Sequence, residues 1–216
     1  MTRTKWILLV VLALVADAIL VRLGVISDLP KLTGTAAWTT SRAAGVIAFA
    51  ALTLDVMFGL FVSTGILDRV VPRGASVDVH RWLSSVALAL VSVHVVVLLV
   101  DPAVHFDALD TLVPGVSAYR PGAIAIGIGA CYGAALVHAS FGWRKRIGVR
   151  AWRALHVIAF AVFAAACAHG ITAGSDTAHS GMRVVYLGAI TLVTALIVLR
   201  IALAIGNRYL RGFVRP

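Results

Sequence analysis

Long runs of apolar residues alternate with short polar segments along this 216-residue chain. Six runs are each about long enough, at ~1.5 Å per residue, to cross a ~30 Å hydrocarbon layer as a helix. They span Trp6–Val21, Ala43–Val62, Leu83–Val100, Gly122–Phe141, Ala154–Ile171 and Val184–Ile205. The pattern predicts an all-α fold, a six-helix bundle that forms one transmembrane domain over residues 1–216.

Composition places this bundle in a membrane. Hydrophobic residues make up 61% of the chain, charged residues only 13%, and the mean hydropathy is +0.98. A soluble domain of this size carries more charge, so the sequence indicates an integral, multi-pass membrane protein. The first run follows Arg3 and Lys5, as the apolar core of a signal peptide would. We interpret it instead as a retained helix, because it completes an even number of transmembrane helices.

Basic residues collect in alternate loop regions. Thirteen of the 19 lie at the amino terminus, in the second-to-third and fourth-to-fifth loop regions, and in the carboxyl-terminal tail. The positive-inside rule therefore predicts that both termini lie in the cytoplasm. We expect the membrane to be the plasma (cytoplasmic) membrane. The net charge of +10 is then a topology signal that can contact anionic lipid, and we expect no nucleic-acid partner.

Four histidines bracket two of the predicted helices. His80 and His94 are fourteen residues apart around the third run, and His156 and His169 are thirteen apart around the fifth. The third and fifth helices run in the same direction, so His80 and His156 share an inner level and His94 and His169 an outer level. The two levels lie ~20 Å apart along the helices. A polar ring in hydrocarbon is costly without a partner, so each histidine is expected to have one.

Two histidines that face each other across a bundle are what bis-imidazole haem ligation needs. The pattern therefore predicts two stacked b-type haems. At ~100° per residue, the fourteen-residue spacing leaves an offset of only ~40°, whereas the thirteen-residue spacing leaves ~140°. The fifth helix must bend, contain an irregular turn, or present its two histidines on different sides.

Three segments resemble a known family. They are "WTTSRAAGVIAFAALTLDVMFGL", "VDVHRWLSSVALALVSVHVVVLL" and "WRKRIGVRAWRALHVIAFAVFAAACAH". They are similar to the ferric reductase-like transmembrane domain, whose superfamily includes NADPH oxidases, ferric reductases and the membrane haem subunit of bacterial methionine sulfoxide reductase systems. The resemblance runs from Trp38 to about Gly170, and its hallmark is two histidine pairs on the third and fifth helices.

The resemblance implies site roles. It makes His80 and His156 the ligands of the inner haem iron, and His94 and His169 the ligands of the outer one. Arg42, in "TTSRAAG", matches a basic residue that several relatives hold near the outer haem. NADPH oxidases continue into flavin and nicotinamide domains, whereas no such domain is expected here, so a separate flavoprotein, a quinol or another carrier must supply the electrons.

Five further residues are candidates with alternatives. Arg153 precedes His156 by three residues, shares its face, and is a candidate for the inner haem propionates or an ordinary positive-inside arginine. Phe163 either bridges the haem edges or packs in the core. His138 is an alternative ligand or a group at the haem edge. Asp17 and Asp55 lie within predicted helices, where each handles protons, is neutral, or pairs with a neighbouring Ser, Thr or Arg.

Two functions remain open at this stage. The first is a dihaem b-type cytochrome, an oxidoreductase or the membrane subunit of one, that passes electrons to an outer acceptor such as a ferric chelate, oxygen, a quinone or a partner reductase. The second is a non-redox proton or metal-ion channel or transporter with a histidine-lined path. "WLSSVALALVS" and "VIAFAVFAAACA", between the histidine levels, are mainly apolar, which favours the cytochrome.

Overall fold

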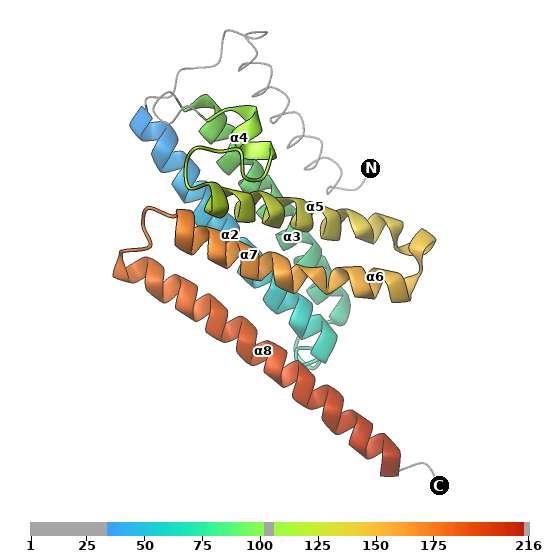
Figure 1. Cartoon of the computed structure of the whole chain (residues 1–216). Coiled ribbons are helices and arrows are strands. Elements are labelled where there is room, and N and C mark those ends of the chain that lie inside the picture. Colours follow the sequence, from blue (N-terminus) through green and yellow to red (C-terminus); the bar gives the residue numbers. More distant parts are fainter. Residues whose placement is uncertain (1–33, 102–105, 214–216) are drawn as a thin grey trace.

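The computed structural model describes residues 34–101 and 106–213, and every regular element within these ranges is a helix. The elements are α2 (Gly34–Thr64), α3 (Arg73–Val100), α4 (Ala108–Leu112), α5 (Pro121–Ile147), α6 (Val149–His156), α7 (Ile158–Ala173) and α8 (Ser180–Phe213) (Figure 1). The all-α prediction is confirmed for these residues. The predicted first helix, Trp6–Val21, lies outside them, as does Asp17.

Five helical segments in the described part of the chain can cross a membrane. They are 25 to 29 residues long, with mean hydropathies of 1.6 to 2.6, and one of them combines α6 and α7. At ~1.5 Å per residue each exceeds the ~30 Å hydrocarbon core. Apolar side chains of α8 such as Val184, Leu187 and Val198 are more than half exposed, which is stable only where the surroundings are lipid. The protein is therefore an integral, multi-pass membrane protein.

The helices extend beyond the apolar runs because their polar ends are also favourable helix termini. Arg144, Lys145 and Arg146 form the last turn of α5, where positive charge complements the negative end of the helix dipole. Gly148 alone then connects α5 to α6 and has φ +81°. Glycine adopts this left-handed conformation without the steric cost that a side chain would add.

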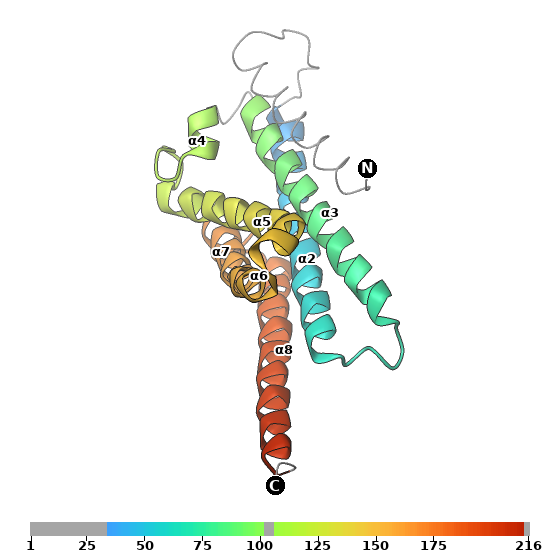
Figure 2. The same ribbon diagram turned by 90° about the vertical axis from the view of Figure 1, so that its right-hand side faces the viewer.

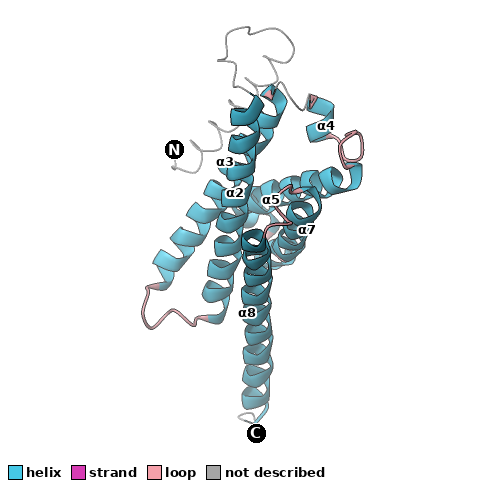
Figure 3. Cartoon of the chain, turned by 90° about the vertical axis from the view of Figure 1, so that its left-hand side faces the viewer, coloured by secondary structure: helices cyan, strands magenta, loops and turns pink. Residues whose placement is uncertain are grey.

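Helix α2 is the central element of the bundle. It packs against α3, α7 and α8, and Figures 1 and 2 show α3 running beside it as the second arm of a helical hairpin. Helices α5 and α7 form a second pair on one side of this hairpin. The connecting loops lie at the ends of the helices (Figure 3). This arrangement leaves α2 and α3 on one side, and α5 and α7 on the other, of the space in which the site is found.

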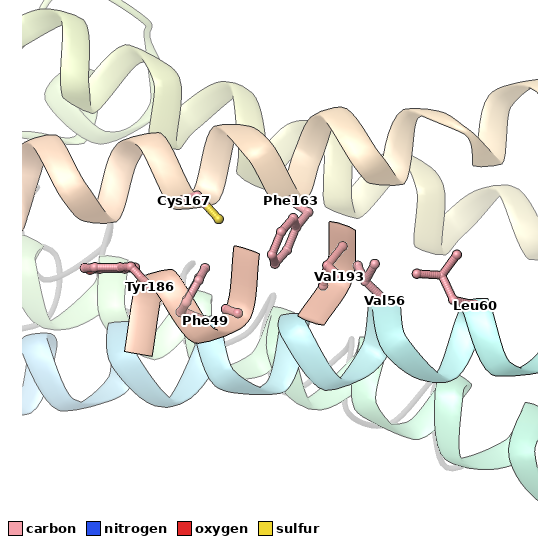
Figure 4. Packing of buried hydrophobic residues seen from close by; sticks show 8 residues of the cluster. Phe49, Val56, Leu60, Phe163, Cys167, Tyr186 and Val193 are labelled. Atoms are coloured by element: carbon pink, nitrogen blue, oxygen red, sulfur yellow. The ribbon is translucent and has the colours of Figure 1, made fainter. Parts of the chain in front are cut away.

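A core of buried side chains joins α2, α7 and α8. Phe49 stacks on Phe163 with 6.1 Å between ring centroids, and its ring meets that of Tyr186 edge to face at 5.2 Å (Figure 4). Offset and edge-to-face pairs add ~0.5–1.5 kcal/mol beyond the apolar area that they bury. Cys167 is buried in the same cluster. These contacts fix the height of α7 relative to α2, and hence the level of the histidines on α7.

The fifth predicted helix, which carries the thirteen-residue histidine spacing, is interrupted. Helix α6 ends at His156, and α7 begins at Ile158. The N–H of Val157 lies 3.3 Å from the carbonyls of both Arg153 and Ala154, and the N–H of Phe160 donates to the carbonyl of Val157 at 3.1 Å. The contacts from Val157 to Ala154 and from Phe160 to Val157 span three residues and tighten the chain locally, as in a 3₁₀ turn. An irregular turn is thus the outcome among the three that the spacing allows.

The basic ends of α3 and α5 meet. The guanidinium carbons of Arg81 and Arg144 lie 4.8 Å and 5.1 Å from the ring centroid of Phe141, and Arg144 also lies 5.5 Å from Trp152. Two loop regions that the sequence analysis assigns to the cytoplasm are therefore at one end of the bundle. Cytoplasmic orientation of this end follows only from the positive-inside rule and stays a prediction.

The orientation can be tested by cysteine labelling. Val70, in the turn between α2 and α3, and Val116, between α4 and α5, are 83% and 53% exposed. We expect a membrane-impermeant maleimide to label Val116→Cys in intact cells and Val70→Cys only after permeabilisation. The unsubstituted protein, with Cys167 buried and Cys131 partly buried, gives the background. The opposite labelling pattern would reverse the orientation.

Candidate functional site

The four histidines form two facing pairs between α3 and the α6–α7 segment. The ring centroids of His80 and His156 are 6.0 Å apart, and those of His94 and His169 are 6.5 Å apart. The rings of each pair are nearly perpendicular, at 81° and 79°. The structure thus brings together the residues that share a level in the sequence analysis.

These separations match two imidazoles on opposite sides of one metal ion. A metal–imidazole bond is ~2 Å long and the ring centre lies ~1 Å beyond the nitrogen, so the two centroids should be ~6 Å apart. Among the described residues, no group of three or more His, Cys, Asp or Glu side chains is placed to hold a metal ion. Two protein ligands per site suit an iron whose other four ligands come from a porphyrin.

Three of the four rings have their Nδ1 atom bound to a backbone carbonyl of a neighbouring helix. Nδ1 of His80 lies 3.0 Å from the carbonyl oxygen of Asp55, that of His94 lies 2.7 Å from Ser41, and that of His169 lies 2.8 Å from Ala123. The acceptors are Asp55 and Ser41 on α2 and Ala123 on α5. A carbonyl only accepts, so each Nδ1 carries the proton and each Nε2 keeps a lone pair for a metal. Metal-ligating histidines are commonly held in this way.

His156 is the exception. Its Nδ1 is buried and has no hydrogen-bond partner within the described ranges, and the same holds for Nε1 of Trp152. The two rings lie against each other, with 5.0 Å between centroids and 31° between planes. Contact with the Trp152 ring, rather than a carbonyl, therefore orients His156.

Glycines on α2 make room for the histidines of α3. A Cβ atom at Gly45 would lie 3.1 Å from Nδ1 of His94, and one at Gly59 would lie 3.2 Å from Cε1 of His80. The two glycines are fourteen residues apart, as are the two histidines. The matched spacing was a signal for these contacts that the sequence analysis did not use.

Helix α5 makes an even closer approach to α7. A Cβ atom at Gly127 would lie only 2.5 Å from Nδ1 of His169, and one at Gly133 would lie 2.6 Å from a methyl group of Val162. Side chains larger than hydrogen do not fit at such distances unless a helix or the facing side chain moves. Gly127 is therefore required for the position of His169.

A cavity of about 360 Å³ lies between the two helix pairs. Its wall includes His94 and His169, and it extends to Asp55 and Ser84 near the inner pair. Most of the other lining residues are apolar. Pockets that hold cofactors have volumes of ~300–1,000 Å³ and mainly apolar walls. The space and its lining therefore suit an apolar cofactor beside His94 and His169, whereas His80 and His156 are not among the lining residues.

Arg42 is paired within the chain. Nε of Arg42 donates to Oδ2 of Asp176 at 2.8 Å, and a terminal nitrogen of the same guanidinium contacts Oδ1. Asp176 lies in the loop between α7 and α8, and both residues border the cavity. These hydrogen bonds hold the pKa of Asp176 below its ordinary value of 3.8. Arg42 thus stands at the outer end of the site with a carboxylate partner, and its predicted contact with a haem propionate stays a prediction.

Phe163 lies in the apolar core, where its ring packs on Phe49. The α7 residues that line the cavity include Ala159, Val162 and Ala166. The structure thus gives Phe163 a packing role, and a bridge between haem edges stays a prediction.

The remaining candidates lie near the inner pair. Nδ1 of His138 is hydrogen-bonded to Oγ of Ser84 at 2.8 Å, and the ring that faces His80 is that of His156. Arg153 is exposed on α6, one turn before His156. Its contact with a haem propionate stays a prediction.

A family model for the ferric reductase like transmembrane component matches residues 44–167, more than half of the chain, and the chain belongs to this family. The match includes His80, His94 and His156 and ends just before His169. No curated protein and no solved structure matches the chain significantly. Family membership indicates a role in membrane electron transfer, and domains of this family typically bind haem.

The close approach at Gly127 gives a stability prediction. Gly127→Ala should force α5 away from α7 or displace the His169 ring, at the ~1–3 kcal/mol typical of overpacking. The matched control is Gly129→Ala, because a Cβ at Gly129 meets no atom within 4 Å. We expect thermal unfolding in detergent at a lower temperature for Gly127→Ala alone. Equal midpoints for the two variants would contradict the packing described here.

The pair of Arg42 and Asp176 gives a pH prediction. Because the folded-state pKa of Asp176 lies below 3.8, the pair stabilises the fold above that pH and its contribution is lost as the pH falls through the folded pKa. Arg42→Gln should lower the unfolding temperature at neutral pH, and its difference from the wild type should shrink in acid. Asp176→Asn should behave alike, whereas a difference that is independent of pH would exclude this explanation.

Proposed function

We propose that the protein is a transmembrane dihaem b-type cytochrome. In this proposal it passes electrons from a cytoplasmic or membrane donor to an acceptor on the outer side. The observation that carries the proposal is the presence of two histidine pairs with centroid separations of 6.0 Å and 6.5 Å. Three of the four rings also have Nδ1 bound to a carbonyl, which leaves Nε2 to bind iron.

His80 and His156 would hold the inner haem, and His94 and His169 the outer one. Bound there, the two haems would supply a pair of one-electron carriers, one near each face of the membrane. The residues of the chain fix the ring positions: carbonyls on α2 and α5 orient three rings, and Trp152 lies against the fourth. Such outer-shell contacts typically change metal affinity ~10–100-fold.

The segments between the two levels favour an electron carrier over an ion path. Hydroxyl groups of Thr53, Ser85 and Ser92 each donate to the carbonyl four residues earlier in their own helix, at 2.8–3.1 Å. They therefore need no water partners. An ion path would instead need a continuous series of groups able to replace the hydration shell.

The donor and acceptor belong to the same proposal. Arg144, Lys145, Arg146 and Arg150 are exposed at the end of the bundle that carries the inner pair. An acidic soluble flavoprotein could dock on this surface by charge complementarity, whereas a quinol would arrive through the bilayer. A flavin or quinone would thus belong to the donor, and the protein would act as an oxidoreductase or as the membrane subunit of one.

Visible spectroscopy of the purified protein tests this function. We expect a low-spin b-type spectrum in the reduced-minus-oxidised difference and two haems per chain. His80→Ala or His156→Ala should remove the inner haem and keep the outer one, because each level has its own two ligands. His94→Ala or His169→Ala should do the reverse.

His179→Ala is the matched control. His179 lies in the loop between α7 and α8 with its side chain 76% exposed, and its removal should leave both haems in place. A folded protein without colour would exclude the cytochrome. Loss of a haem in His138→Ala but not in His156→Ala would show that the inner ligands are paired differently.

A further inference from the structure

The two histidines of α3 are held by α2 in the same way at both levels. At the outer level the Ser41 carbonyl accepts from Nδ1 of His94, and at the inner level the Asp55 carbonyl accepts from Nδ1 of His80. Ser41 and Asp55 are fourteen residues apart, and each is followed four residues later by the glycine on which its histidine rests. The backbone arrangement therefore repeats along α2.

The side chains at these equivalent positions differ in charge. Oγ of Ser41 lies 3.0 Å from Nδ1 of His94, and its hydroxyl donates to the carbonyl of His94 at 3.2 Å. At the inner level Oδ1 of Asp55 lies 2.7 Å from Nδ1 of His80. A neutral hydroxyl at one level is thus replaced by a carboxylate at the other.

Both groups of the inner contact are largely shielded from solvent. The side chain of Asp55 is 12% exposed and that of His80 is 20% exposed. A charge that is shielded in this way is screened by water and salt far less than a surface charge. Asp55 therefore acts on the His80 ring at short range and with little attenuation.

We propose that Asp55 is a positioning and tuning residue that lowers the reduction potential of the inner haem below that of the outer haem. This inference rests on the proposed function and deepens it. The Nδ1–H of His80 donates to the carbonyl of Asp55, so the carboxylate acts on the ring through its charge at 2.7 Å rather than through a hydrogen bond of its own. That charge favours the oxidised state of the bound iron, which has one more positive charge than the reduced state.

A lower reduction potential at the inner site would favour electron transfer from the inner to the outer site. Exchange between the two levels moves one electron and forms or breaks no bond: the inner site is oxidised and the outer site is reduced. A lower potential at the inner site places the electron at the outer site at equilibrium. Asp55 thus biases the chain towards delivery at the outer face, whichever donor reduces the inner site.

A redox titration followed by visible spectroscopy tests the proposal on the intact protein, with dithionite as reductant and ferricyanide as oxidant. His80→Ala and His94→Ala, each retaining one haem, assign the two components. In the wild type the component of lower potential should be the one that His80→Ala removes. If His94→Ala removes it instead, the proposal is overturned.

Asp55→Asn removes the charge and keeps the shape. We expect it to raise the midpoint of the inner component enough to change the electron distribution between the levels about tenfold, which is ~59 mV for a one-electron couple. The outer midpoint should stay constant. The matched control is Asp68→Asn, which removes a carboxylate paired with Arg73 at the same end of the bundle and should leave both midpoints unchanged.

The outcomes separate the two proposals. An unchanged inner midpoint in Asp55→Asn, or an equal shift in Asp68→Asn, overturns the role of Asp55. If Asp55→Asn no longer holds the inner haem, Asp55→Glu decides: a wild-type inner midpoint supports the proposal and a raised one overturns it. A wild-type protein that binds no haem overturns the proposed function itself.

Discussion

An imidazole ring enclosed in an apolar bundle is costly unless its Nδ1–H finds an acceptor, and three of the four paired histidines find one. The acceptors are backbone carbonyls of neighbouring helices. A ring on one helix can reach a carbonyl on the next only where the two backbones approach closely. Gly45, Gly59 and Gly127 permit this approach. The hydrogen bonds in turn fix the direction of the His80, His94 and His169 rings, and with it the position of each Nε2. The spacing of α2 from α3, and of α5 from α7, is therefore set by the hydrogen bonds between histidine Nδ1 atoms and backbone carbonyls.

The level of each histidine could be predicted from the sequence, since the rise along a helix is nearly constant and adjacent membrane helices alternate in direction. His80 accordingly faces His156, and His94 faces His169. Direction around the helix axis was harder to predict. The thirteen-residue spacing required some irregularity, but its place at Val157 depends on local hydrogen bonds and on the packing of α7 against the core.

The partners of the histidines were not predicted, although a pattern for them is present. Residues 41–45 and 55–59 of α2 each begin with the residue that binds a histidine and end with the glycine that makes room for it. Neither serine nor aspartate is distinctive by itself, and a glycine in a membrane helix is common. Only knowledge that α2 packs on α3 relates the two spacings. The partner of Arg42, Asp176 in a distant loop, likewise depends on how the helices pack.

Along α2 the backbone contacts to the two histidines of α3 repeat, whereas the side chains beside those histidines differ. The carbonyl and glycine of α2 place the α3 histidine in the same way at both levels. The side chain that precedes each glycine by four residues is free to differ, and here it is the hydroxyl of Ser41 at one level and the carboxyl group of Asp55 at the other. A helix that repeats its backbone contacts can therefore give two similar sites different electrostatic surroundings through one side chain. In the proposed dihaem cytochrome, such a difference would order the two sites in energy without a change in the backbone that holds the histidines of α3.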